Sequence, residues 1–180
     1  MFHSVVEVYL IRHTTPDIAK GIIYGHFDVP LSNTFEIEKK QILNQLPSNI
    51  DKVFSSPSKR CMKLAEAISK DISIDESLKE LNFGLWEGLN WDEISRTDSD
   101  YWMDDFVNRC PPQGETLLAM QARVLEFWKS LHNMRLQKVA IVTHAGVIRI
   151  ILSHLNKSPL NSIFDLPVNY GQLFTLTINQ

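Results

Sequence analysis

The stretch Lys138-Val139-Ala140-Ile141-Val142-Thr143-His144-Ala145-Gly146 decides the fold. Residues 139–143 form the clearest β-strand pattern in the chain, because they are apolar and rich in β-branched residues. His144-Ala145-Gly146 then marks a tight turn, and residues 147–155 have the pattern of a helix. A strand that runs through a short turn into a helix is the repeating unit of an α/β fold.

Further units of the same kind lie on both sides of this stretch. Residues 5–11 are almost continuously apolar, as expected of a strand that is covered on both faces. Asn33 and Glu36 have the spacing of a capping box, and Ser56-Pro57 is typical of a helix start. The other expected elements are strands over 52–55, 72–74 and 174–178, the last at an edge, and helices over 33–46, 56–69 and 115–134. The alternation predicts a three-layer α/β/α sandwich with a mostly parallel sheet.

Residues 80–112 break this alternation. They are rich in aromatic and acidic residues and have only short helical patterns, so we interpret them as a small lid insertion. The aromatic cluster is expected to form the lid's own core, and Trp86 or a neighbour is a less favoured candidate for packing on an aromatic leaving group. With 180 residues, the chain has the length of one domain, and we expect a single domain over 1–180.

Composition and charge exclude several classes of protein. The formal net charge of −3 argues against a nucleic-acid binder, which usually carries an excess of basic residues. Cys61 and Cys110 are too few for a disulfide scaffold and form no Cys-x-x-Cys pair. No apolar run is long enough to cross a membrane, and no secretory signal is recognisable. We therefore expect a cytoplasmic protein that binds neither nucleic acid nor membranes.

Polar side chains gather where the predicted strands end. Arg12-His13 follows the first strand, Ser55-Ser56-Pro57-Ser58-Lys59-Arg60 follows the second, and His144 follows the strand near Ile141. In an open α/β sheet, ligands bind beyond the carboxyl ends of the strands. Two imidazoles and two forked guanidiniums at one edge suit a phosphoryl group.

This set of residues favours nucleophilic catalysis by His13. A neighbouring arginine disfavours the imidazolium, and neutral imidazole can attack phosphorus. A carboxylic acid would then protonate the departing alkoxide. Glu80, Glu87 and Asp28 are all candidates for that acid, and spacing does not choose among them.

The motifs together resemble the histidine phosphatase superfamily, also called phosphoglycerate-mutase-like. The resemblance rests on a set of segments that keep the family's order over nearly the whole chain. They are Leu10-Ile11-Arg12-His13 with Ser55-Ser56-Pro57-x-x-Arg60, Glu80-x-Asn82-Phe83-Gly84-x-Trp86-Glu87-Gly88, Gly114-Glu115-Thr116 with Arg123, and Thr143-His144-Ala145-Gly146-Val147-Ile148-Arg149. Any one of them is a weak signal, but the set in order is specific.

The resemblance implies a role for each matching residue. His13 would be the phosphorylated nucleophile, and Glu80 would be the proton donor. Arg12, Arg60 and His144 would hold the phosphoryl oxygens. The family's reaction implies neither a metal nor a cofactor, and the expected partner is a small-molecule phosphomonoester.

Within the family, two segments look most like α-ribazole phosphatases of cobalamin nucleotide-loop assembly. They are Arg12-His13-Thr14-Thr15-Pro16-Asp17 and Tyr24-Gly25-x-x-Asp28-Val29-Pro30-Leu31. Thr14 stands where the family usually has Gly, and Ala19 stands where many members have Asn. We hypothesise that a hydroxyl of Thr14 or Thr15 replaces that Asn. The expected substrate-binding residues are Thr14, Thr15, Tyr24, Gly25, His26 and Ala145.

Other interpretations stay open at this point. The alternatives are a broad-specificity small-molecule or sugar phosphatase, a phosphoglycerate mutase-like enzyme, and an inactive relative that only binds phosphorylated ligands. Ser55 and Ser56 are expected to cap the following helix. Arg149 is expected to hold the turn or the C-terminal segment rather than to act in the site.

Overall fold

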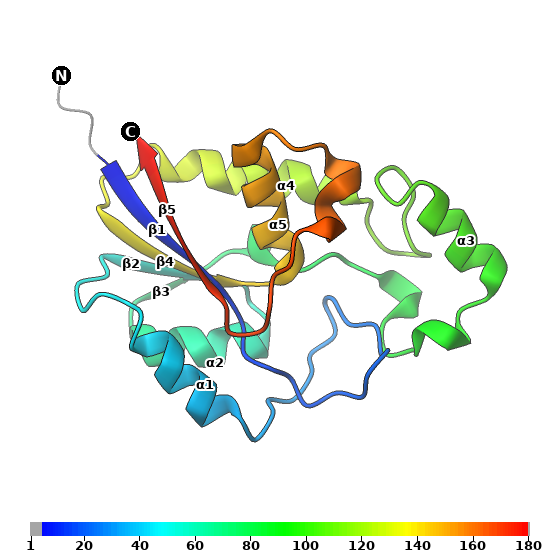
Figure 1. Cartoon of the computed structure of the whole chain (residues 1–180), viewed down its shortest axis with the longest axis horizontal. Helices are drawn as coiled ribbons and strands as arrows, with labels where there is room; N and C mark the ends of the chain where they lie inside the picture. Colours follow the sequence, from blue (N-terminus) through cyan, green and yellow to red (C-terminus); the bar gives the residue numbers. More distant parts are fainter. Residues whose placement is uncertain (1–4, 180) are drawn as a thin grey trace.

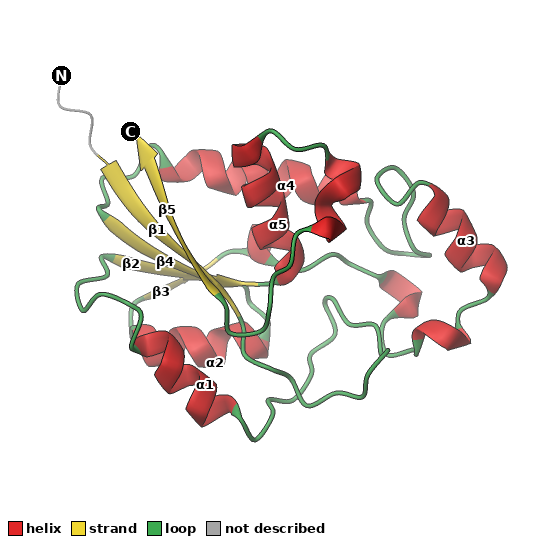
Figure 2. Cartoon of the chain, viewed as in Figure 1, coloured by secondary structure: helices red, strands yellow, loops and turns green. Residues whose placement is uncertain are grey.

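A computed structural model describes residues 5–179, and its centre is a five-stranded sheet (Figure 2). The strand order is β3-β2-β4-β1-β5, with β1, β2, β3 and β4 parallel and β5 antiparallel to β1 at one edge. The strands are β1 (Val5–Arg12), β2 (Lys52–Ser55), β3 (Ile72–Ile74), β4 (Lys138–Thr143) and β5 (Leu173–Asn179). The predictions of a mostly parallel sheet and of a last strand at its edge are confirmed.

Helices cover both faces of the sheet, which confirms the predicted three-layer sandwich. Helices α1 (Phe35–Leu43) and α2 (Lys59–Ile68) lie on one face, and α4 (Leu117–Leu131) and α5 (Ala145–Asn156) lie on the other (Figure 1). Side chains alternate between the two faces of a strand, so a doubly covered strand must be apolar at every position. In β1, Val6, Val8 and Leu10 pack in the α4 and α5 layer, whereas Tyr9 and Ile11 pack in the α1 and α2 layer.

The segment predicted as a lid lies beyond one end of the sheet, where α3 (Arg96–Asp104) is seen in Figure 1. Short 3-10 helices precede α3 at Gly84–Trp86 and Trp91–Glu93. The rings of Trp86, Trp91 and Trp102 meet edge to face at centroid distances of 5.8–6.0 Å. These contacts agree with a local aromatic core. Two further 3-10 helices lie outside this segment, at Glu76–Leu78 and Leu160–Asp165.

Two predicted helix starts are wrong. Helix α1 begins at Phe35 after Thr34, and the predicted capping box at Asn33 does not form, because the Asn33 amide oxygen accepts from Ser32 instead. Helix α2 begins at Lys59, with Ser58 rather than Ser55 or Ser56 as its N-cap residue.

Candidate active site

The polar clusters predicted from the strand ends meet at one edge of the sheet. β1 and β4 are parallel neighbours, with Arg12 opposite Thr143. His13 directly follows β1 and His144 directly follows β4, so the two histidines lie side by side at the strand ends. Their rings lie 5.3 Å apart between centroids. A cavity of about 390 Å³ opens at this edge. Of the predicted site residues, its walls include Arg12, His13, Tyr24, Glu80, His144 and Ala145.

Arg60 connects both histidines to the loop after β1. Its side chain is fully buried and is not among the residues that line the cavity, although it contacts His13 and His144, which do. Nε donates to Nε2 of His13 at 3.3 Å, and Nη2 lies 3.2 Å from Nδ1 of His144. The guanidinium also donates to the backbone carbonyls of Gly25 at 2.6 Å and Phe27 at 3.0 Å. One forked cation therefore sets the positions of two imidazoles and one loop.

The contacts of His13 fix its tautomer. Nδ1 lies 2.8 Å from the carbonyl oxygen of Thr14, which can only accept, so Nδ1 carries the proton. Nε2 faces the Arg60 guanidinium, which can only donate, so Nε2 keeps its lone pair. Burial lowers the pKa of His13 to about 3, with the Arg60 charge as the second cause. The ring is thus neutral at neutral pH, with a nucleophilic nitrogen at the cavity.

His144 is neutral for the same reasons. Burial and the Arg60 charge hold its pKa well below the usual 6.5. Because Nδ1 accepts from Arg60, Nε2 carries the proton and donates to the Ser56 hydroxyl at 2.8 Å. Ser56 thus orients a site imidazole instead of capping α2. The buried Cys61 sulfur also contacts this ring, 3.5 Å from Nε2.

These neutral histidines predict a pH-dependent stability. The folded protein binds a proton on His13 only near pH 3, whereas the unfolded chain binds one below about pH 6.5. The stability gained from the neutral ring is complete above pH 6.5 and is lost as the pH falls toward 3. His13→Asn, which cannot titrate, is expected to flatten the decline of the urea midpoint between pH 6.5 and 4. His154→Gln, at an exposed position of α5, is the control and should keep the wild-type slope. An equally steep slope in His13→Asn would contradict the assignment.

Arg12 is held by the loop before β5. Its Nη1 donates to the carbonyl of Val168 at 2.6 Å, and its guanidinium carbon lies 3.7 Å from the ring centroid of Tyr170. The Tyr170 ring lies 5.6 Å from that of His13, and its hydroxyl pairs with Tyr24. Tyr170 was not among the predicted site residues. Antiparallel pairing of the last strand with β1 would have placed this loop beside Arg12 and His13.

Glu80 is the one of the three candidate acids that lines the cavity. Its carboxylate accepts from its neighbour Leu81 N at 2.9 Å and from Gly146 N, in the first turn of α5, at 3.1 Å. A Cβ on Gly146 would lie 2.2 Å from that carboxylate, so only glycine allows this approach. The carboxylate therefore lies at the same helix start as His144.

The other two candidate acids have different partners. Glu87 accepts from three backbone N–H groups, those of His26, Phe27 and Phe83. Asp28 accepts from the backbone N–H of Lys59 at the start of α2, at 3.0 Å. Both carboxylates fix loops and neither lines the cavity.

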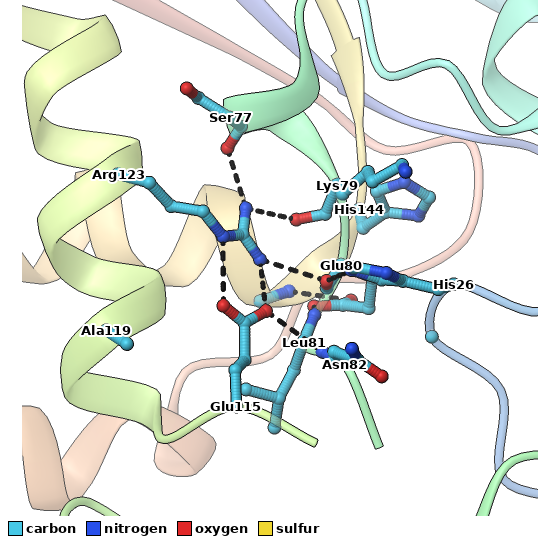
Figure 3. A network of polar contacts seen from close by, with 12 residues as sticks. His26, Ser77, Lys79, Glu80, Leu81, Asn82, Glu115, Ala119, Arg123 and His144 are labelled. Carbon is cyan, nitrogen blue, oxygen red and sulfur yellow. Dashed lines mark hydrogen bonds and ion pairs between the residues drawn. The ribbon is translucent and has the colours of Figure 1, made fainter. Parts of the chain in front are cut away.

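An arginine on α4 holds the backbone that carries Glu80 (Figure 3). Arg123 donates to the carbonyls of Ser77, Lys79 and Glu80 at 2.8–3.0 Å and pairs with Glu115. Glu115 in turn accepts from the backbone N–H of Asn82 at 2.9 Å. The network therefore fixes the backbone on both sides of Glu80, which positions its side chain at the cavity.

Four predicted substrate-binding residues do not line the cavity. The Thr14 side chain is fully buried, and its hydroxyl has no hydrogen-bond partner within residues 5–179. Thr15 donates its backbone N–H to Glu38, in α1. Gly25 supplies a carbonyl to Arg60, and the His26 ring lies 3.0 Å from the carbonyl of Glu80. For Gly25 and His26, the contacts are with catalytic candidates rather than with the cavity.

The far wall of the cavity is apolar and aromatic, and the sequence analysis did not assign most of it. Trp91 and Trp102 line it, whereas Trp86 is buried behind them. Phe83 and Phe164 complete the aromatic part. The cavity lining thus combines a cationic part, with Arg12 beside His13, and an aromatic part, which we call the cationic and aromatic ends.

The described residues contain no group of three or more His, Cys, Asp or Glu side chains that could hold a metal ion. In residues 5–179, no helix is both long and apolar enough to cross a membrane.

Comparison with known proteins identifies the family. The model of the histidine phosphatase superfamily (branch 1) matches residues 8–180, and the chain belongs to this superfamily. Adenosylcobalamin/alpha-ribazole phosphatase of Escherichia coli is 27% identical, over 97% of this chain and 91% of that protein. A putative phosphoserine phosphatase 2 of Hydrogenobacter thermophilus is 26% identical, over 89% of this chain and 83% of that protein. The crystal structure of the alpha-ribazole phosphatase from Shigella flexneri superposes with a TM-score of 0.89 at 25% identity, covering 97% and 92% of the two chains. These relatives support a phosphatase activity.

Proposed function

We propose that the protein is a metal-independent phosphomonoesterase that works through a phosphohistidine at His13. The observation that carries the proposal is the buried, neutral His13 ring, whose free Nε2 meets Arg60 at the cationic end of the cavity. A second neutral imidazole and Arg12 lie at the same end. Such a group of donors compensates the charge of a phosphoryl group as it is transferred.

The first step of the proposed reaction transfers the phosphoryl group to the enzyme. The lone pair of His13 Nε2 attacks phosphorus, and the bond between phosphorus and the ester oxygen breaks. Glu80 gives its proton to the departing oxygen, so the leaving group departs as an alcohol. Arg12 and Arg60 donate to the phosphoryl oxygens, and the substrate takes over the donor that Arg60 directs at Nε2 in the free protein. His144, whose single N–H is given to Ser56 in the free protein, donates to a phosphoryl oxygen once it exchanges that partner.

The second step releases phosphate. A water molecule attacks the phosphorus of phospho-His13 while the Glu80 carboxylate removes one of its protons. The bond between phosphorus and Nε2 breaks, inorganic phosphate leaves, and His13 is neutral again. Each residue returns to its starting protonation state, and no metal takes part.

The role of Glu80 predicts a dependence on the leaving group. Glu80→Gln keeps the shape of the side chain but supplies no proton. For an alkyl phosphate, kcat/KM is expected to fall about 10²–10⁴-fold, the usual contribution of general acid catalysis. For p-nitrophenyl phosphate, whose leaving group needs no proton, the loss should be much smaller. Rates of both substrates with wild type and variant check this prediction. Equal losses for both substrates would show that Glu80 only shapes the site.

For the substrate, we propose α-ribazole 5′-phosphate, hydrolysed in the cytoplasm during cobalamin nucleotide-loop assembly. The aromatic end of the cavity, with Trp91, Trp102, Phe83 and Phe164, suits an aromatic leaving group. Two of the relatives described above carry that substrate in their names.

A substrate panel tests this assignment. We expect kcat/KM for α-ribazole phosphate to exceed those for O-phosphoserine, 3-phosphoglycerate, fructose phosphates and nucleotides by more than tenfold, with and without EDTA. A preference below tenfold would instead favour a broad-specificity phosphatase, and isomer exchange of phosphoglycerate would favour a mutase. Loss of activity in EDTA would contradict the metal-independent mechanism.

A further inference from the structure

A second cavity arginine, Arg149, has no assigned part in the proposed chemistry. It lies on α5 one helical turn after His144, and its side chain is one of the cavity walls. Nε donates to the carbonyl of Leu166 at 2.9 Å, and the guanidinium lies 5.8 Å from the ring centroid of Phe164. The expectation that Arg149 holds the C-terminal segment is thus supported by the Nε contact. That contact uses only one of five N–H donors.

Arg149 is held in the same manner as Arg12. Each guanidinium donates to one carbonyl of residues 166–168 and faces one aromatic ring from the same part of the chain. Arg12 lies beside His13 at the phosphoryl end. Arg149 shares the cavity with Phe164, Trp102 and other side chains of the aromatic end. The fold therefore presents a second anchored guanidinium to the cavity.

The remaining donors of Arg149 lack protein acceptors. No hydrogen bond or ion pair joins its Nη groups to another side chain or carbonyl within residues 5–179. The Glu80 carboxyl group also lines the cavity, but it accepts from Leu81 and Gly146. Burial lowers the pKa of Arg149 from its usual value, and the charge of Glu80 opposes that effect. The remaining donors of Arg149 are not among the buried polar atoms that lack a partner in residues 5–179, so they are open to the cavity and available to a ligand.

We propose that Arg149 is a specificity-determining residue that donates hydrogen bonds to an acceptor atom on the leaving group. This inference rests on the proposed phosphatase function and adds the substrate class to it. The preferred substrates are phosphomonoesters whose leaving group carries an acceptor, either a neutral ring nitrogen or a carboxylate. The aromatic base of α-ribazole has such a ring nitrogen, and the carboxylate of phosphoserine is the anionic counterpart.

The test uses three synthetic substrates with similar leaving alcohols. Benzyl phosphate has no acceptor on its ring, pyridin-3-ylmethyl phosphate has a ring nitrogen, and 3-carboxybenzyl phosphate has a carboxylate. The measured quantity is the ratio of kcat/KM for each acceptor substrate to that for benzyl phosphate. Both rates come from one preparation, so any inactive protein cancels from the ratio.

Wild type is expected to prefer at least one acceptor substrate by tenfold or more. Arg149→Met should reduce that preference to less than threefold, and Arg149→Lys should keep part of it for the carboxylate. Arg96→Met, at an exposed position of α3, is the control and should keep the wild-type ratios. If only one of the two acceptor substrates is preferred, the result identifies whether Arg149 binds a ring nitrogen or a carboxylate.

Two results would overturn the inference. They are wild-type ratios near one for both acceptor substrates, and wild-type ratios that persist in Arg149→Met. Failure of the phosphatase function looks different, because benzyl phosphate itself would then not be hydrolysed by the wild type.

Discussion

Replacement of His13 by alanine is expected to abolish turnover, with a loss of at least about four orders of magnitude. The side chain provides the proposed nucleophile, the unprotonated Nε2 beside the Arg60 guanidinium. Without it, no covalent intermediate can form, and water would have to attack the ester directly. Initial rates with p-nitrophenyl phosphate measure the loss.

A second measurement ties the loss to the intermediate. Wild type, mixed with a radiolabelled phosphomonoester and quenched at alkaline pH, should retain label on the protein, and His13→Ala should retain none. His154→Ala, which removes an exposed imidazole of α5, is the matched control and should behave as wild type. Wild-type turnover in His13→Ala would reject the mechanism. If the wild type retains no label and shows no turnover, the alternative of an inactive relative that only binds phosphorylated ligands would be favoured.

Replacement of Arg60 by alanine is expected to lower kcat about 10²–10³-fold, the usual effect of removing one preorganised donor. The sequence pattern predicts this loss without unfolding, but the structure revises that expectation. Arg60 is fully buried, and its removal leaves the carbonyls of Gly25 and Phe27 without a donor. Each unpaired buried group costs about 1–3 kcal/mol, so the free energy of unfolding should fall as well.

Two further variants separate charge from geometry at this position. Arg60→Lys keeps the positive charge but not the fork, and it cannot reach both histidines and both carbonyls together. It should therefore also lose most of the activity. Lys63→Ala, an exposed position on the same helix, is the control for α2. Urea unfolding gives the stability, and kcat is corrected for the folded fraction. A loss of kcat below tenfold in Arg60→Ala would contradict the proposed role.

The sequence predicted the parts of the site that follow parallel strands. Apolar runs marked β1, β2 and β4, and parallel strands bring their carboxyl ends to one edge, so His13, Arg60 and His144 could be placed together. Glu80 was chosen among three acids only through the family pattern. The position of Glu80 at the cavity depends on its contacts with Arg123 and Gly146. These residues are 43 and 66 positions away from it in the sequence.

The parts that could not be predicted depend on long-range packing. Tyr170 reaches the cavity because the C-terminal loop returns beside β1, and no local pattern encodes that return. Arg149 enters from α5, but its contact with the carbonyl of Leu166 depends on the same return. The N-cap residues Thr34 and Ser58 were missed because neither makes the side-chain capping bond by which a helix start is recognised in a sequence. The interpretation of residues 80–112 as a lid insertion, and of the chain as one domain, stays a prediction.

The aromatic far wall has a consequence for how this enzyme could change. Trp91 and Trp102 belong to residues 80–112, outside the sheet, whereas His13 and His144 directly follow strands and are joined by Arg60. Mutations of the aromatic residues can alter which leaving group is accepted while the proposed catalytic residues stay unchanged. New substrate ranges can therefore arise by drift in one region, which makes the chain a convenient starting point for laboratory evolution.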